Sequence, residues 1–186
     1  MTATLTQPAL KEWGAVVHAT LDGRQTVLLR KGGIHEKRFE VAASRFLFFP
    51  TVAHSHAERV RPEHRELLDC AAADSTEDAV VIRAGARVVA AIAVERPEGL
   101  KEIAPLHIWT EESVQADRLD FRPRHRLTVL VIAATPLAEP VRLTRTPDYR
   151  GCNSWVQLPL NPVWGLPVHD DATLDDLARR VRDSVG

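Results

Sequence analysis

The feature that most limits the fold of this 186-residue chain is an apolar run, rich in β-branched side chains, from Leu127 to Ala134. Runs of this kind and length are typical of strands that are buried on both faces of a sheet. A second apolar stretch, residues 79–94, is interrupted at Gly85 and predicts a hairpin of strands 79–83 and 87–94. We therefore expect the core to form around a β-sheet.

Shorter apolar segments predict the remaining strands. They lie at 26–29, at 45–49 and at 154–158. The second of these should end at Pro50, because proline has no N–H to donate to a β-ladder.

Helices are predicted wherever apolar residues recur at helical spacing or a capping residue precedes them. They cover residues 9–21, 63–73 and 111–116, with a final helix that begins at Asp171 or Thr173 and ends near Val185. The resulting order lacks the regular βαβ alternation of a parallel α/β protein. The predicted fold class is α+β, with a mixed or antiparallel sheet or a small β-barrel, flanking helices and a C-terminal helix.

The length fits one domain with a sizeable core. Pro159, Pro162 and Pro167 make an extended connector before the last helix. We therefore predict an N-terminal tail (1–8), a single α+β domain (9–158), and a connector with a C-terminal helix packed on that domain (159–186).

Charge and cysteine content limit the class of partner and the compartment. The net charge of −1 and the pI near 6.7 provide no overall positive field that would attract DNA, RNA or an anionic membrane. Cys70 and Cys152 lack the spacing of a zinc site and are expected to be reduced thiols. No stretch approaches the ~20 apolar residues of a membrane span, and the first nine residues lack the features of a signal peptide. A cytoplasmic location without membrane contact is the expectation.

The segment around Arg30 is the main candidate for a binding site. Arg30, Lys31, Gly32 and Gly33 place two cations and two glycines at the end of a predicted strand, where backbone N–H groups and a guanidinium can bind phosphate or carboxylate. The segment contains neither a P-loop nor a dinucleotide-binding fingerprint. An ordinary charged turn is the alternative interpretation.

His35 and Glu36 follow this turn and can form a general base with an orienting carboxylate if they lie in a loop. With His54, and with His107 as a further ligand, they also provide the residue types of a metal-assisted hydrolase or nuclease. Recognisable metal, serine-hydrolase and cysteine-protease motifs are absent, so no enzyme class, resident cofactor or metal is predicted.

Four tryptophans are present, and two of them accompany other candidate residues. Trp109 follows His107 closely in sequence, and Trp155 is the second residue of the last predicted strand. Either indole can stack on a base or sugar. Packing in the core is the alternative for both.

Several segments together resemble a bacterial family catalogued as domain of unknown function 1802. They are Ala9 to Trp13, Leu28 to Ile34, Phe46 to Thr51 with His54, His107 to Trp109, and Gly151 to Trp155. The resemblance covers residues 9 to about 158 and implies no established activity.

A more distant resemblance connects the chain with PUA-like folds, in particular the ASCH and EVE domains. Gly23 and Arg30 match the first and last residues of the ASCH pattern Gly-x-Lys-x-x-Glu-x-Arg, whereas Gln25 and Leu28 replace its Lys and Glu. Residues 87–95 and 129–143 are similar to other strands of these domains. The resemblance implies a small barrel that recognises RNA or modified nucleobases.

Together these observations favour a PUA-like module that binds a nucleotide, a modified base or RNA. The expected binding residues are Arg30, Lys31, Gly32, Gly33, His35, Glu36, His54, His107, Trp109 and Trp155. A metal-assisted hydrolase that uses His35, Glu36 and His54, and a partner-binding protein without a small-molecule site, are the alternatives. The sequence predicts no oligomeric state.

Overall fold

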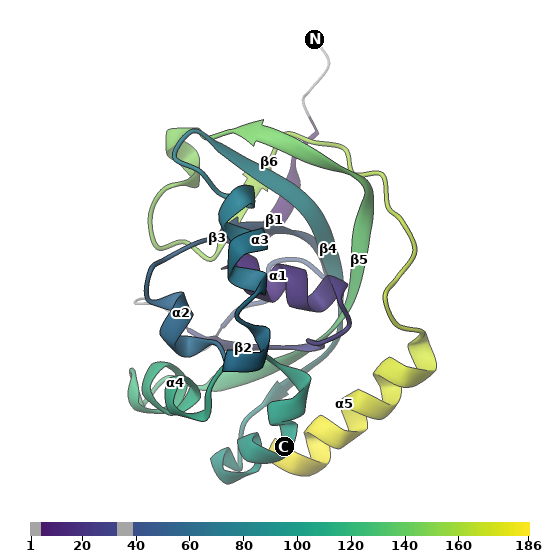
Figure 1. Ribbon diagram of the computed structural model, residues 1–186. Coiled ribbons are helices and arrows are strands. Elements are labelled where there is room, and N and C mark those ends of the chain that lie inside the picture. Colours follow the sequence, from purple (N-terminus) through teal and green to yellow (C-terminus); the bar gives the residue numbers. More distant parts are fainter. Residues whose placement is uncertain (1–4, 33–38) are drawn as a thin grey trace.

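The computed structural model describes residues 5–32 and 39–186 and contains a six-stranded sheet (Figure 1). The strand order is β2-β5-β4-β3-β1-β6. The strands are β1 (Gln7–Trp13), β2 (Val27–Lys31), β3 (Arg45–Thr51), β4 (Ala79–Ala93), β5 (Leu127–Thr144) and β6 (Trp155–Leu158). Strands β1 and β3 are parallel and the other neighbours are antiparallel, so the sheet is mixed. Of the two predicted architectures, the open mixed sheet is observed, with β2 and β6 as its edges within the described chain.

The helices surround this sheet. They are α1 (Gly14–Leu21), α2 (His56–Arg59), α3 (Leu67–Asp74), α4 (Glu111–Val114) and α5 (Asp171–Val185), with the shorter or irregular turns η1 (Pro62–His64), η2 (Pro97–Leu106), η3 (Gln115–Asp120) and η4 (Pro147–Tyr149). Figure 1 shows the long strands β4 and β5 curving around α1, which packs against α3. Helix α5 lies outside this curve and packs against η2, β4 and β5. In the described part of the chain, no helix has the length and apolar character needed to cross a membrane.

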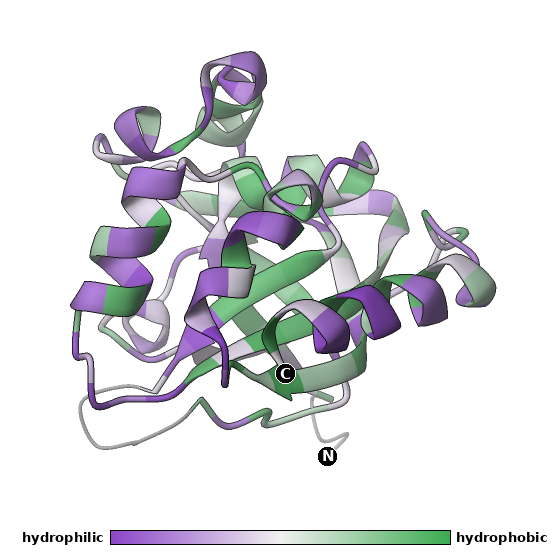
Figure 2. Ribbon diagram, turned by 90° about the horizontal axis from the view of Figure 1, so that it is seen from below, coloured by the Kyte–Doolittle hydropathy of each residue, from purple (hydrophilic) through white to green (hydrophobic). Residues whose placement is uncertain are grey.

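Strand β3, in the middle of the sheet, is buried on both faces, which explains its apolar run. In β3, Phe46 and Phe48 belong to the larger core around α1, whereas Leu47 and Phe49 belong to a second core on the opposite face. This division follows from the alternation of side chains along a strand. Figure 2 shows the strands coloured mainly as hydrophobic and the surrounding helices carrying the hydrophilic residues.

The predicted hairpin at residues 79–94 is wrong, because β4 is one continuous strand through Gly85. A Cβ at Gly85 would lie 2.3 Å from the Phe46 carbonyl oxygen and 2.5 Å from the Trp164 ring. The glycine therefore permits a close approach between neighbouring segments and does not turn the chain. Register shifts on either side of this region bend the strand instead.

The predicted helix at residues 9–21 is correct only in its second half. Residues 7–13 form β1, because their backbone pairs with both β3 and β6, and α1 begins at Gly14. Strand β3 also continues through Pro50 to Thr51, whose hydroxyl donates to the Glu12 carbonyl at 3.2 Å. This side-chain hydrogen bond connects β3 to β1 beyond the proline.

The remaining predicted strands and helices are of the correct type, although several begin or end at other residues than predicted. Strands β2, β5 and β6 and the final helix confirm the predictions at 26–29, 127–134, 154–158 and 171–185, although β5 is much longer than predicted. Asp170 caps the final helix by accepting from the Thr173 N–H at 2.7 Å. Residues 54–64, which follow the third strand, contain α2 and η1, and α3 begins later than predicted, at Leu67.

Candidate functional site

Arg30 lies at the end of β2, where its backbone pairs with Thr128 of β5. Its guanidinium donates to the Lys11 carbonyl at 3.2 Å and to the Glu12 carboxylate at 3.3 Å. The guanidinium carbon lies 5.0 Å from the centre of the Phe39 ring. The predicted strand-end arginine is therefore held between a carboxylate and an aromatic ring.

Glu12 is a buried carboxylate at the end of β1, with 2% of its side chain exposed. Its Oε1 accepts the Trp13 N–H at 2.9 Å, and its Oε2 pairs with Arg30. Burial of a carboxylate is costly unless charged groups or hydrogen-bond donors compensate it. The buried Glu12 carboxylate therefore favours positively charged side chains near the end of β1.

Arg118, on η3, lies in the electrostatic field of the same carboxylate. Burial lowers the pKa of Arg118 below its ordinary value; Glu12 raises this pKa, and the Arg30 guanidinium lowers it again. The Arg118 guanidinium carbon lies 5.8 Å from the Trp109 ring. Among the described residues its one hydrogen bond is a long one, 3.4 Å to the Asp117 carbonyl. Most of its N–H groups therefore have no acceptor within residues 5–32 and 39–186.

Arg59 on α2 completes the group by pairing with Asp117 at 2.7 Å. We call Glu12, Arg30, Arg59, Asp117 and Arg118 the Glu12 cluster. Three guanidinium groups and two carboxylates leave one excess positive charge in this part-buried region. An anion is the ligand that such an arrangement favours.

Aromatic rings border the Glu12 cluster. The Trp13 indole stacks on the His56 ring at 3.8 Å between centroids and meets Trp109 edge to face at 6.2 Å. Burial, together with the nearby Arg59 guanidinium, lowers the pKa of His56 to about 4. His56 is therefore neutral at pH 7 and adds no charge to the cluster.

Lys31 and Gly32 hold the neighbouring segment in place. The Lys31 ammonium donates to the carbonyls of Leu119, Phe121 and Arg122 at 3.5, 2.5 and 3.0 Å, which connects β2 to the end of η3. Burial lowers the pKa of Lys31. The Gly32 carbonyl lies 3.2 Å from His125 Nδ1. The predicted residues Gly33, His35 and Glu36 lie outside the described residues.

The other predicted residues separate into three places. The Trp155 ring stacks on the Phe39 ring with 6.0 Å between their centroids, and Phe39 also contacts the Arg30 guanidinium. His107 and Trp109 are buried and line a cavity that does not include Phe39 or Trp155. His54 is exposed in the turn before α2. The structure thus brings Arg30 and Trp155 to Phe39, places Trp109 against Arg118, and leaves His54 apart.

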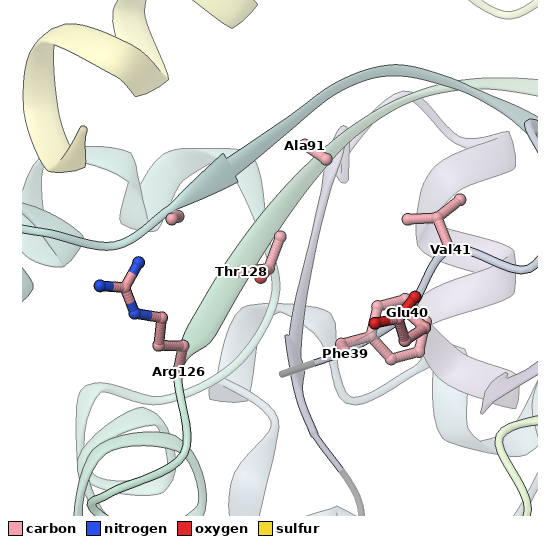
Figure 3. Close-up of a pocket in the computed structure, with 7 residues that line it drawn as sticks. Phe39, Glu40, Val41, Ala91, Arg126 and Thr128 are labelled. Atoms are coloured by element: carbon pink, nitrogen blue, oxygen red, sulfur yellow. The ribbon is translucent and has the colours of Figure 1, made fainter. Parts of the chain in front are cut away.

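A cavity of about 280 Å³ lies beside Phe39 (Figure 3). Figure 3 shows Thr128 on β5 and Arg126 just before this strand, across from the segment that carries Phe39, Glu40 and Val41. Thr128 is the pairing partner of Arg30, and Phe39 contacts the Arg30 guanidinium. The cavity therefore adjoins the strand-end site.

Glu12, His56 and Arg118 were missed in the sequence. Glu12 belonged to a predicted helix, where a charged residue is expected on the solvent side. Recognising 7–13 as a strand between two others would have marked Glu12 as a buried charge. Nothing in the local sequence distinguishes Arg118 from the nearby Arg122, Arg124 and Arg126.

No group of three or more His, Cys, Asp or Glu side chains within residues 5–32 and 39–186 is arranged to hold a metal ion. The described members of the metal-assisted alternative, His54 and His107, are respectively exposed and buried.

Solved structures with related shapes come from the ASCH protein of Zymomonas mobilis. One is 11% identical, with a TM-score of 0.45 over 96% of this chain and 95% of that chain. A structure of a mutant of the same protein is 16% identical, with a TM-score of 0.43 over 72% of this chain and 73% of that chain. None of the curated proteins matches this sequence significantly. The family described as a domain of unknown function (DUF1802) matches residues 9–180, and the chain therefore belongs to that family.

Proposed function

We propose that this protein is a binding module for a phosphate-bearing ligand of the nucleotide or RNA class, and that the Glu12 cluster holds the phosphate. The observation that carries the proposal is one buried carboxylate, Glu12, which pairs with the Arg30 guanidinium and lies in the electrostatic field of the Arg118 guanidinium. Such an excess of guanidinium charge is costly to keep out of water unless an anion compensates it.

The geometry of the two arginines suits a phosphate group. A guanidinium presents planar N–H pairs that match phosphate oxygens, and such charge-assisted bonds are shorter and stronger than neutral ones. Among the described residues, Arg30 Nη1 donates to the Lys11 carbonyl at 3.2 Å and to Glu12 at 3.3 Å, and Arg118 Nη1 donates to the Asp117 carbonyl at 3.4 Å. Both therefore retain donors for an incoming oxyanion.

The surroundings favour a ligand that has a planar ring as well as a phosphate. Phe39 lies between Arg30 and Trp155, and the cavity of Figure 3 opens beside it. Aromatic side chains next to a basic group are the usual means of holding a base. The resemblance of residues 23–30 to the ASCH pattern supports the same class of ligand.

Lys31 has a positioning role in this proposal. Its ammonium is bonded to three carbonyls at the end of η3, the element that carries Arg118. It therefore sets the distance between β2 and Arg118, and phosphate contact falls to the two arginines. The Gly32 carbonyl, next to His125, supports the same connection.

Removing the Arg30 guanidinium should weaken ligand binding by about tenfold or more, the usual worth of a charge-assisted bond to phosphate. Mononucleotides, a single-stranded oligoribonucleotide and inorganic phosphate are titrated against the protein by calorimetry, with Arg30→Ala as the test variant. Arg124→Ala, an exposed arginine outside the cluster, is the matched control and should bind like the wild type.

The relative affinities of these ligands show which class of ligand the protein binds. Tighter binding of a nucleotide or the oligoribonucleotide than of inorganic phosphate supports the proposal, provided that Arg30→Ala loses it. No saturable binding by any of these ligands, or equal binding by Arg30→Ala and the wild type, would overturn it.

A further inference from the structure

A second cavity, of about 240 Å³, lies between η2 and the segment formed by α4 and η3. Its walls are mainly apolar and include two buried rings. The wall residues that matter here are Leu100, Ala104, His107, Trp109, Val114 and Leu119. The volume is below the ~300–1,000 Å³ of pockets for drug-sized ligands, so it suits a molecule with a single ring.

His107 offers this cavity a neutral hydrogen-bond donor. Burial, with the nearby Arg61 guanidinium, lowers the pKa of His107 to about 3, so the ring is uncharged at pH 7. The Trp109 backbone N–H donates to His107 Nδ1 at 3.2 Å, which makes Nδ1 the acceptor and places the proton on Nε2. No described residue accepts from this Nε2–H, and Nε2 is not one of the fully buried atoms that lack a partner, although the side chain is only 3% exposed. The donor is therefore open to a ligand in the cavity, and a donor in apolar surroundings is normally paired.

The Trp109 indole, on the same wall, also lacks a partner. Its Nε1–H is buried without an acceptor in the described part of the chain. The His107 and Trp109 rings are 5.2 Å apart between centroids. Two neighbouring rings with unpaired donors are therefore found on one side of this cavity.

The Arg61 guanidinium, which also lines the cavity, has no donor left for a ligand. Its five N–H groups point to protein acceptors, and the Glu63 carboxylate at 3.1 Å balances its charge. The acceptors are Glu63 Oε1, His64 Nε2 and the carbonyls of Ala104, His107 and Trp109. Among the described residues that line the cavity, the remaining cation is Lys101, which pairs with Glu111, so a carboxylate or phosphate in the interior would meet no free charged donor.

The mouth of the cavity carries one ion pair that joins its two sides. Lys101 on η2 lies 3.4 Å from Glu111 on α4, and both side chains are largely exposed. Because the pair is neutral as a whole and exposed, it leaves the interior apolar and can separate at little cost.

We propose that this cavity binds a small uncharged molecule with one apolar ring and one carbonyl-type oxygen, which accepts a hydrogen bond from His107 Nε2–H. The apolar walls hold the ring, and the single donor selects for the oxygen. This site differs from the Glu12 cluster in its ligand and does not include Arg30, although Trp109 borders both.

Two probes of equal shape test the role of the donor. Acetophenone has a carbonyl oxygen where α-methylstyrene has a CH₂ group, so the two differ in the acceptor alone. Binding is followed through the indole and imidazole N–H resonances by NMR. Acetophenone should bind about five- to tenfold more tightly than α-methylstyrene, the worth of one hydrogen bond. The His107 Nε2–H resonance should move with acceptor binding.

Three variants separate the donor from the cavity. His107→Phe keeps a ring but removes the donor, so both probes should bind with equal affinity. Ala104→Phe fills the cavity and should abolish the binding of both probes. His54→Phe makes the same change at an exposed histidine and should leave the preference intact. Arg30→Ala should also leave it intact, which distinguishes this site from the nucleotide site.

The absence of saturable binding by both probes, the same preference in His107→Phe as in the wild type, or unchanged binding in Ala104→Phe would overturn the proposal. If His107→Phe does not fold, the wild-type resonances decide. A His107 Nε2–H resonance that responds equally to both probes would then contradict the proposed hydrogen bond.

Discussion

Acidification from pH 6.5 to pH 4 is expected to destabilise the protein by several kcal/mol through two buried histidines. Burial lowers the pKa of His56 to about 4 and that of His107 to about 3, from an ordinary value of 6.5 in the unfolded chain. Between these limits the unfolded chain binds more protons than the folded protein, so stability falls as the pH falls. Each pKa unit corresponds to roughly 1.4 kcal/mol, which makes about 3 kcal/mol for His56 alone.

Urea denaturation at pH 7, 5.5 and 4.5 measures this dependence. The stabilising contribution is complete above pH 6.5, and the part from His107 continues to decline until about pH 3. His56→Gln and His107→Gln should each reduce the slope of stability against pH. His54→Gln, at an exposed position, should leave the slope unchanged. Equal stability at pH 7 and 4.5 would contradict the burial of neutral histidines in the folded protein.

Glu12→Ala is expected to lower stability by about 3–5 kcal/mol, because it leaves the part-buried Arg30 without its carboxylate partner and removes the negative charge that raises the pKa of Arg118. Glu12→Gln should cost less, since its amide oxygen can still accept the Trp13 N–H that Glu12 Oε1 now accepts. Both variants remove the anion that competes with a ligand phosphate. Glu12→Gln should therefore bind phosphate-bearing ligands more tightly than the wild type, despite its lower stability.

Chemical denaturation and calorimetric titration of the same preparations check both results. Glu66→Ala is the matched control, because Glu66 is an exposed carboxylate that pairs with Arg24, and such pairs contribute little. A Glu12→Ala protein as stable as this control would show that the cluster is not electrostatically coupled. Weaker phosphate binding by Glu12→Gln would show that Glu12 does not compete with the ligand.

Hydrophobic patterns predicted the strand segments that are buried. The segment 127–134 is apolar except for Thr128, because this half of β5 has neighbouring strands on both sides and belongs to the larger core. Gly85 misled the prediction, since a glycine inside a strand pattern is compatible with a turn and with a close approach. The Phe46 carbonyl and the Trp164 ring, both distant in sequence, decide between the two.

The prediction of a helix at residues 9–21 was wrong in its first half for a similar reason. Leu10 and Trp13 are spaced three residues apart, which fits one face of a helix. The apolar Leu10 followed by the polar Lys11 also fits the alternation of side chains in a strand. The strand is favoured because its backbone finds partners in β3 and β6, which the local sequence does not encode.

The candidate site was predictable at Arg30, where a strand end, two cations and two glycines coincide. Its partners were not, because Glu12 comes from a different strand and Arg118 from an irregular helical turn far along the chain. Their association depends on the fold. A sequence pattern can therefore indicate where a site begins without showing the charges that complete it.

Arg118→Met tests the central claim most directly, because it gives opposite results for stability and binding. The Arg118 guanidinium is part-buried with one long hydrogen bond, and the Glu12–Arg30 pair remains without it. An apolar replacement should keep or raise stability, by up to about 2 kcal/mol, as replacement of buried charges often does. Thermal unfolding and nucleotide titration of this one variant should show an unchanged or higher Tm together with at least tenfold weaker binding. Wild-type nucleotide binding by Arg118→Met, or a fall in Tm together with the loss of binding, would contradict the account.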